Sequence, residues 1–76
     1  MKPISEERLA ALKREYPPGT RISLVRMDDP YTKLMPGDLG TVTGIDDTGT
    51  VFVSWDKGSS LGLVYGIDLY RKAVGE

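Results

Sequence analysis

The side chains that enzymes most often use for nucleophilic and acid–base chemistry are missing from this sequence. Its 76 residues include no histidine and no cysteine, which removes the commonest general base, the thiolate nucleophile and the usual ligands of zinc. The serines therefore have no histidine to deprotonate them. We expect no catalytic residue and no enzymatic activity.

The carboxylates are the remaining candidates for chemistry, and most of them stand in short, turn-like segments. Asp46 and Asp47 precede Thr48 and Gly49 in a stretch that is typical of a tight hairpin turn. A calcium loop spreads its oxygen ligands over about 12 residues, and a two-carboxylate hydrolase needs a cleft for which so small a domain has little room. We therefore expect these aspartates to cap turns, and we expect no metal site and no cofactor.

The segment at residues 27–37 is the most suggestive candidate for binding, because it is long, polar and interrupted by proline. Aromatic and ionic side chains on a loop beside a rigid scaffold are typical of binding sites. We expect this loop to form a groove with a turn at residues 65–68, and the groove to bind a protein segment. The predicted partner-binding residues are Asp28, Asp29, Tyr31, Lys33 and Tyr65.

Most members of this set have a defined role in the predicted groove. Tyr31 and Tyr65 would form its aromatic walls. Asp28 would select a cationic group of the partner, and Lys33 would select an anionic one. The alternative is a loop that only supports itself, in which Asp29 caps a single helical turn that continues through Lys33.

Nucleic acid is the alternative partner. Residues 1–26 contain six basic and three acidic side chains, whereas residues 27–76 contain four and eight. Five basic residues would converge if the first and last strands pair: Arg14, Arg21, Arg26, Arg71 and Lys72. A phosphate-binding surface usually has a clear basic stripe, but this chain has a net charge of −1. We therefore rank nucleic acid behind a protein segment.

A helix that docks on the rest of the domain is expected at residues 5–16, after a short arm at residues 1–4. Ser5 is a good N-cap, because its hydroxyl can accept a hydrogen bond from an unpaired amide of the first turn. One apolar stripe at helical spacing consists of Leu9, Leu12 and Tyr16. Pro17 ends the helix. A helix of this length is marginal on its own, so the apolar stripe must pack against something.

From residue 20 onward, apolar residues recur at every second position, which indicates β-strands. The expected strands lie at residues 20–26, 38–46, 50–55, 61–64 and 69–72. Together they predict a mainly β fold: a five-stranded SH3-like small barrel at residues 20–72, with one N-terminal α-helix and a tail at residues 73–76. The alternative is an open four-stranded meander under the helix.

The same alternation predicts which side chains face the core. The inward residues include Ile22, Leu24, Val42, Val51, Val53, Trp55, Leu61 and Leu63. The outward apolar residues are Val25, Phe52 and Val64. Small soluble domains usually cover or use such an outward apolar patch. We therefore expect the helix to dock over an outer surface that includes Phe52 or Val25.

Three strings of the sequence resemble a small bacterial and phage family of unknown function: YPPGTR at residues 16–21, MDDPYTKL at 27–34 and PGDLGTV at 36–42. This resemblance extends over about residues 16–72. The string GTVFVSWDKG at residues 49–58 is similar to SH3-like repeats of Mind-bomb-type ubiquitin ligases, which bind protein segments. Residues 37–42 are similar to part of the KOW motif, found in barrels that contact RNA or protein. Both short resemblances imply an SH3-like barrel.

The first residues contain no apolar region typical of a signal peptide, and no apolar run approaches the roughly 20 residues of a membrane-spanning helix. We therefore expect a cytoplasmic protein that does not enter membranes and exists as a monomer or a weak dimer. The overall prediction is a non-enzymatic interaction module for a protein segment, with nucleic acid as the alternative ligand.

Overall fold

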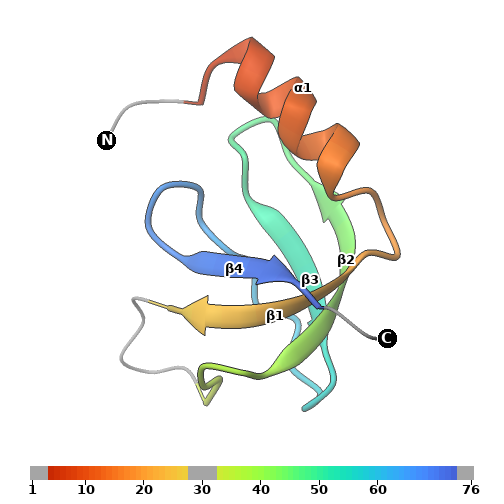
Figure 1. Ribbon diagram of the computed structural model, residues 1–76, viewed down its shortest axis with the longest axis vertical. Coiled ribbons are helices and arrows are strands. Elements are labelled where there is room, and N and C mark those ends of the chain that lie inside the picture. Colours follow the sequence, from red (N-terminus) through yellow and green to blue (C-terminus); the bar gives the residue numbers. More distant parts are fainter. Residues whose placement is uncertain (1–3, 28–32, 74–76) are drawn as a thin grey trace.

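The computed structural model of the protein describes residues 4–27 and 33–73 (Figure 1). Its elements are α1 (Glu6–Glu15), β1 (Arg21–Arg26), β2 (Leu39–Ile45), β3 (Val51–Trp55) and β4 (Leu69–Lys72). The four strands form one antiparallel sheet in the order β3-β2-β1-β4. The sheet curls, and α1 lies across one end of it, beside the turn that joins β2 to β3 (Figure 1).

The helix begins and ends where its sequence signals predict. The Ser5 hydroxyl accepts a hydrogen bond from the Arg8 amide at 3.1 Å, which satisfies one of the free amides of the first turn. Glu6 and Glu7 lie in that first turn, where the helix dipole favours negative charge. At the other end, the amide of Tyr16 donates to the Leu12 carbonyl at 2.9 Å.

The core lies on the concave side of the sheet and follows the predicted alternation, except that Leu34 of the loop before β2 also belongs to it. It consists of Ile22, Leu24, Leu34, Val42, Val51, Val53, Trp55 and Leu63. A glycine in β2 allows two of these side chains to pack closely. A Cβ atom at Gly40 would lie 2.5 Å from Val53 Cγ1 and 2.8 Å from Trp55 Cε3, so any larger residue there must displace the core.

The prediction of a fifth strand at residues 61–64 was wrong, because this segment makes only an isolated bridge between Leu63 and Val51. Those two residues exchange backbone hydrogen bonds of 2.8 and 2.9 Å. On either side of the bridge, the backbone forms hydrogen bonds with side chains in place of a neighbouring strand. The Trp55 indole donates to the Leu61 carbonyl, and the Asp68 carboxylate accepts from the Val64 amide, both at 2.8 Å. Leu61 is consequently 36% exposed, not inward as predicted.

The sheet does not close into a barrel within the described residues. β4 pairs with β1, as predicted, but no described strand joins β4 to β3. The alternative prediction, a meander, is also wrong in its order, because successive pairing would place β4 beside β3. The open side of the core is instead covered in part by the helix.

The predicted docking surface of the helix was also wrong. Leu12 and Tyr16 pack against the main core cluster, whereas Phe52 and Val25 remain 43% and 42% exposed. The physical reason is that an unclosed sheet leaves apolar core surface uncovered at its open side. Covering that surface removes more apolar area from water than covering isolated outward side chains.

Candidate binding surface

The register of β1 and β4 brings the two segments of the predicted groove to the same end of the sheet. Arg26, the last residue of β1, pairs with Leu69, the first residue of β4. The loop at residues 27–37 therefore begins beside the point where the turn at residues 65–68 ends. Asp28, Asp29 and Tyr31 lie outside the described residues.

The turn at residues 65–68 is present and is held by a buried carboxylate. The amides of Ile67 and Asp68 donate to the Val64 carbonyl at 3.2 and 3.0 Å. Asp68 is only 8% exposed, and its Oδ2 accepts from the Val64 amide. Asp68 therefore shapes the turn, a role that its position immediately before a short strand did not reveal.

Lys33 lies in the loop before β2, near the turn that follows β3. Its backbone carbonyl accepts a hydrogen bond from Lys57 Nζ at 3.1 Å. The same ammonium pairs with the Asp38 carboxylate at 2.9 Å. This hydrogen bond from Lys57 lowers the pKa of Asp38. The Lys33 side chain itself is exposed.

Tyr65 lies next to the helix and the turn between β2 and β3. Its Cβ would be 3.1 Å from a Cβ atom placed on Gly49, a residue whose φ of +87° already favours glycine. Tyr65 also lines a hollow of about 220 Å³ beneath α1. Lys33 and Tyr65 thus have different surroundings: Lys33 is close to Lys57, and Tyr65 is close to α1.

The hollow beneath α1 was not predicted from the sequence. Its lining residues are Arg8, Ala11, Leu12, Glu15, Tyr16 and Tyr65. The members from α1 and its C-cap residue Tyr16 recur at intervals of three or four residues, which places them on one face of the helix. This spacing was the available signal, but Leu12 and Tyr16 were assigned to a packing stripe alone.

The aromatic side chain of Tyr16 connects this hollow to β4. Its ring meets that of Tyr70 edge-to-face, with centroids 5.3 Å apart, and Lys72 Nζ lies 5.4 Å from its centroid. Burial, followed by the nearby Tyr16, Glu15 and Tyr65, raises the pKa of Tyr70 to about 12. Burial, followed by Glu15, also raises the pKa of Tyr16. Both phenols therefore stay neutral hydrogen-bond donors near pH 7.

The basic residues of the alternative prediction do not form one patch. Arg21 is held by Asp56 in a two-pronged ion pair of 2.8 and 2.6 Å, and it also donates to the Thr41 hydroxyl at 3.0 Å. This pairing lowers the pKa of Asp56. In β4, Arg71 pairs with Ser23, whereas Lys72 pairs with the buried Ile22.

Side chains alternate along a strand, so Arg71 projects from the outer face of the sheet and Lys72 from the core face. Arg26 is exposed at the far end of β1, and Arg14 is exposed on the helix. The five predicted contacts are therefore distributed over several surfaces of the protein.

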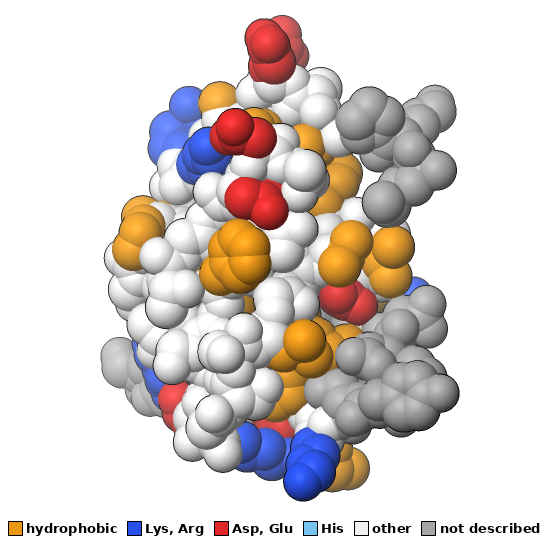
Figure 2. All heavy atoms as spheres, turned by 180° about the vertical axis from the view of Figure 1, so that it is seen from behind, with side chains coloured by type: hydrophobic (Ala, Val, Ile, Leu, Met, Phe, Trp, Pro, Cys, Tyr) orange, Lys and Arg blue, Asp and Glu red, His pale blue; other side chains and the backbone are white. Residues whose placement is uncertain are grey.

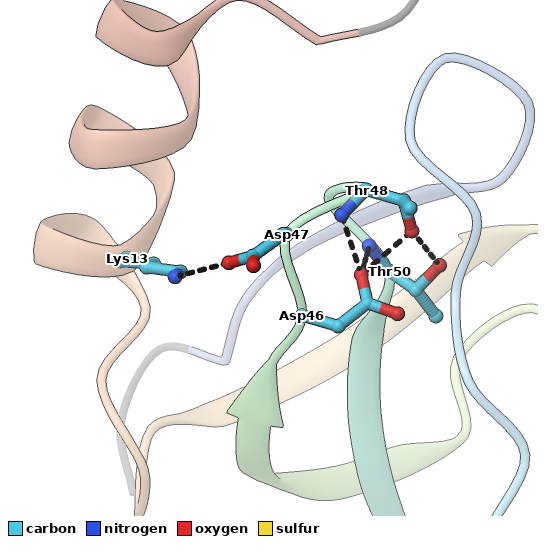
Figure 3. A network of polar contacts seen from close by, with 5 residues as sticks. All are labelled: Lys13, Asp46, Asp47, Thr48 and Thr50. Atoms are coloured by element: carbon cyan, nitrogen blue, oxygen red, sulfur yellow. Dashed lines mark hydrogen bonds and ion pairs between the residues drawn. The ribbon is translucent and has the colours of Figure 1, made fainter.

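In the turn between β2 and β3, Asp46 caps the backbone as predicted, whereas Asp47 does not (Figure 3). Oδ1 of Asp46 accepts from the Thr48 amide and hydroxyl at 2.9 and 2.7 Å, and from the Thr50 amide at 2.9 Å. These bonds, led by the Thr48 hydroxyl, lower the pKa of Asp46. Asp47 points the other way and pairs with Lys13 of α1 at 3.3 Å (Figure 3).

The surface seen from behind the view of Figure 1 has no continuous hydrophobic face; its hydrophobic side chains lie in separate groups, several of them along one edge (Figure 2). Within residues 4–27 and 33–73, no three histidine, cysteine or acidic residues are arranged to hold a metal ion. In the same part of the chain, the helix is too short and too polar to cross a lipid bilayer.

These features define a small β-rich domain with one helix packed against an open four-stranded sheet. A family model described as "Domain of unknown function (DUF4314)" matches residues 5–73, and the chain belongs to this family. Comparison with curated proteins and with solved structures gave no match.

Proposed function

We propose that the protein is a non-enzymatic interaction module, and that it binds a protein segment in the groove between the loop at residues 27–37 and the turn at residues 65–68. The observation that carries this proposal is the concentration of exposed apolar side chains on these two segments and the adjoining strand ends. They are Met35, Leu69, Val25 and Ile67, with exposed fractions of 62%, 49%, 42% and 38%. Exposed apolar groups of this kind gain most from a partner that covers them.

We also propose that the fold is a reduced form of the SH3-like barrel. Two features support this assignment: β1 lies between β2 and the last strand, and Leu63 bridges to β3 where such a barrel has its fourth strand. In this interpretation the loop at residues 27–37 corresponds to the long first loop of the barrel. Long loops at the end of a rigid sheet are common sites of recognition.

Nucleic acid remains the second candidate, supported by the exposed side chains of Arg14, Arg26 and Arg71. Arg26 and Arg71 share the outer face of the sheet, but Arg14 lies apart from them on the helix. This arrangement argues against one long phosphate-binding stripe, which supplies most of the affinity of nucleic-acid binders. A binder of this kind would also lose affinity steeply as the salt concentration rises.

The test is selection of random 12-residue peptides on the immobilised full chain, followed by titration of a selected peptide into the ¹⁵N-labelled protein. We expect the largest amide shifts at residues 25–27, 33–35 and 65–69. Leu69→Ser and Tyr31→Ala should each weaken binding at least tenfold. Phe52→Ser is the matched control, because Phe52 is similarly exposed on β3 but lies outside the groove.

Three results would overturn the proposal: no peptide is selected, the shifts map elsewhere, or Phe52→Ser weakens binding as much as Leu69→Ser does. Submicromolar binding of a DNA or RNA oligonucleotide at physiological salt would favour the second candidate instead.

A further inference from the structure

We infer that the free edge of β4 is a docking strand, which pairs with an extended acidic peptide and places one of its apolar side chains in the hollow beneath α1. The inference rests on the proposed function, since it assumes that the partner is a protein segment. It places that segment along β4, which begins where the turn at residues 65–68 ends, and it gives the binding mode, the conformation and the charge of the segment.

The backbone of β4 has a row of outward hydrogen-bonding groups. The Ala73 amide donates to the Arg21 carbonyl at 3.0 Å, and antiparallel pairing alternates along the strand. The backbone amide and carbonyl of Arg71 therefore point toward Ser23 in β1. The amides and carbonyls of Tyr70 and Lys72 point away from β1.

The other edge of β1 confirms this register. The Val42 amide donates to the Thr20 carbonyl at 2.8 Å, and the Leu24 amide donates to the Asp38 carbonyl at 2.9 Å. The backbone groups of the even-numbered residues from 20 to 24 therefore form hydrogen bonds toward β2. The backbone groups of the odd-numbered residues point toward β4.

These outward groups of Tyr70 and Lys72 have no hydrogen-bond partner within the described part of the chain. Two amides and two carbonyls that alternate at the spacing of a strand are complementary to another strand, and to few other ligands. Addition of an extended peptide to an exposed sheet edge is a common mode of recognition.

The hollow beneath α1 adjoins this edge through Tyr16, which lines the hollow and contacts both Tyr70 and Lys72. Leu12 and Ala11 provide apolar surface at its helical wall. Its volume of about 220 Å³ is below the roughly 300–1,000 Å³ of pockets that bind drug-sized ligands. The hollow therefore suits one large apolar side chain of a peptide better than an independent small molecule.

The charges around the edge select an acidic partner. β4 contains Arg71 and Lys72 and no acidic residue, and Arg26 lies opposite its first residue. Within the described residues none of these three cations forms an ion pair. A carboxylate on the added peptide would therefore meet Arg71 on the outer face of the sheet or Lys72 on the core face.

The same charges disfavour a second copy of this chain as the occupant. Antiparallel pairing of two β4 strands would bring the Arg71 and Lys72 side chains of both copies close together, and like charges across a strand pair are destabilising. Lysine on an edge strand is a common protection against such self-pairing. The protection leaves an acidic peptide free to bind.

The experiment uses the ¹⁵N-labelled full chain and a nine-residue peptide that alternates glutamate with valine around a central phenylalanine. We expect amide shifts and slowed hydrogen exchange at Tyr70 and Lys72. N-methylation of alternate peptide residues should weaken binding at least tenfold in one register, whereas methylation in the other register should have little effect. Ala11→Leu should also weaken binding at least tenfold, because it fills the hollow, and Ala10→Leu on the exposed side of the helix is its control.

Several results would overturn the inference. Peptides that shift the amides of residues 25–27 and 33–35 but leave those of Tyr70 and Lys72 unchanged would reject the docking strand while preserving the proposed function. Equal sensitivity to both methylation registers would reject strand pairing. A lysine peptide that binds as tightly as the glutamate peptide would reject the charge argument, and a stable dimer that excludes the peptide would show a second copy at this edge.

Discussion

The two hairpins around β3 and the region formed by α1 and β4 are built in opposite ways. β3 places Val51, Val53 and Trp55 almost completely out of water, and the turns on both sides of it are closed by backbone and aspartate hydrogen bonds. In contrast, α1 and β4 contain no fully buried residue, and they meet the core through half-buried side chains such as Leu12 and Tyr70. The comparison indicates that the hairpins supply most of the stability, whereas the α1–β4 region supplies the surface available to a partner.

The largest expected effect is the difference in unfolding free energy between two leucine-to-alanine variants, one in each region. Leu63 has no exposed surface and bridges to β3, so Leu63→Ala should cost about 2–5 kcal/mol of unfolding free energy. Leu12 is only partly buried, so Leu12→Ala should cost about 1–2 kcal/mol, a fraction of the value for full burial. Urea denaturation of both variants measures the difference.

If Leu12→Ala is as damaging as Leu63→Ala, the comparison between the two regions fails. A chain lacking residues 1–15 provides the second measurement: it should unfold at a lower urea midpoint than the wild type and still unfold cooperatively. An unchanged midpoint would show that α1 does not contribute to the core.

Alkali should weaken the α1–β4 region first. The folded state raises the pKa of Tyr70 from its usual 10.0 to about 12, so the folded protein retains a proton that the unfolded chain loses. The corresponding stability is present below pH 10 and is lost as the pH rises toward 12. We expect the thermal midpoint to fall over this range, and to fall less in Tyr70→Phe. An identical alkaline decline in both proteins would show that Tyr70 is not the titrating group.

Acid should lower the stability of the hairpins. The pKa values of Asp38, Asp46 and Asp56 are lowered by their hydrogen bonds, so these groups favour folding when ionised. Their contribution is present above the usual carboxyl pKa of 3.8 and is lost as the pH falls through the lower folded values.

Asp46→Asn retains an acceptor oxygen but cannot titrate, so its thermal midpoint should decline less steeply below pH 4. Asp47→Asn in the same turn is the control and should retain the acid slope of the wild type. If Asp46→Asn and the wild type decline in parallel, the turn is not the source of the acid sensitivity.

The sequence predicted the hairpin region well because its signals are local. Alternation at Val51, Val53 and Trp55 specifies one buried face, since a shift by one residue would turn every apolar side chain outward. Asp46 and Gly49 specify the turn, because glycine readily adopts the positive φ that the turn needs.

The α1–β4 region was predicted less well because its arrangement depends on distant partners. The ends of α1 were evident from Ser5 and Pro17, but the surface that it covers depends on whether the sheet closes. Closure in turn depends on the segment around Leu63, where hydrogen bonds from Trp55 and to Asp68 compete with strand pairing. The alternation of apolar residues within that segment gives no sign of these competing hydrogen bonds.

The smallest expected effect concerns the ion pair that connects the two regions. Lys13 of α1 and Asp47 of the β2–β3 turn are 3.3 Å apart, but their side chains are 45% and 95% exposed. Exposed pairs of this kind contribute about 0–1 kcal/mol, because water and salt screen the charges and both side chains lose freedom. A double-mutant cycle with Lys13→Ala and Asp47→Ala should therefore give a coupling free energy within that range, and 1 M NaCl should remove most of it. A larger, salt-resistant coupling would mean that this contact fixes the helix on the hairpin, and that the α1–β4 region is less independent than its half-buried packing indicates.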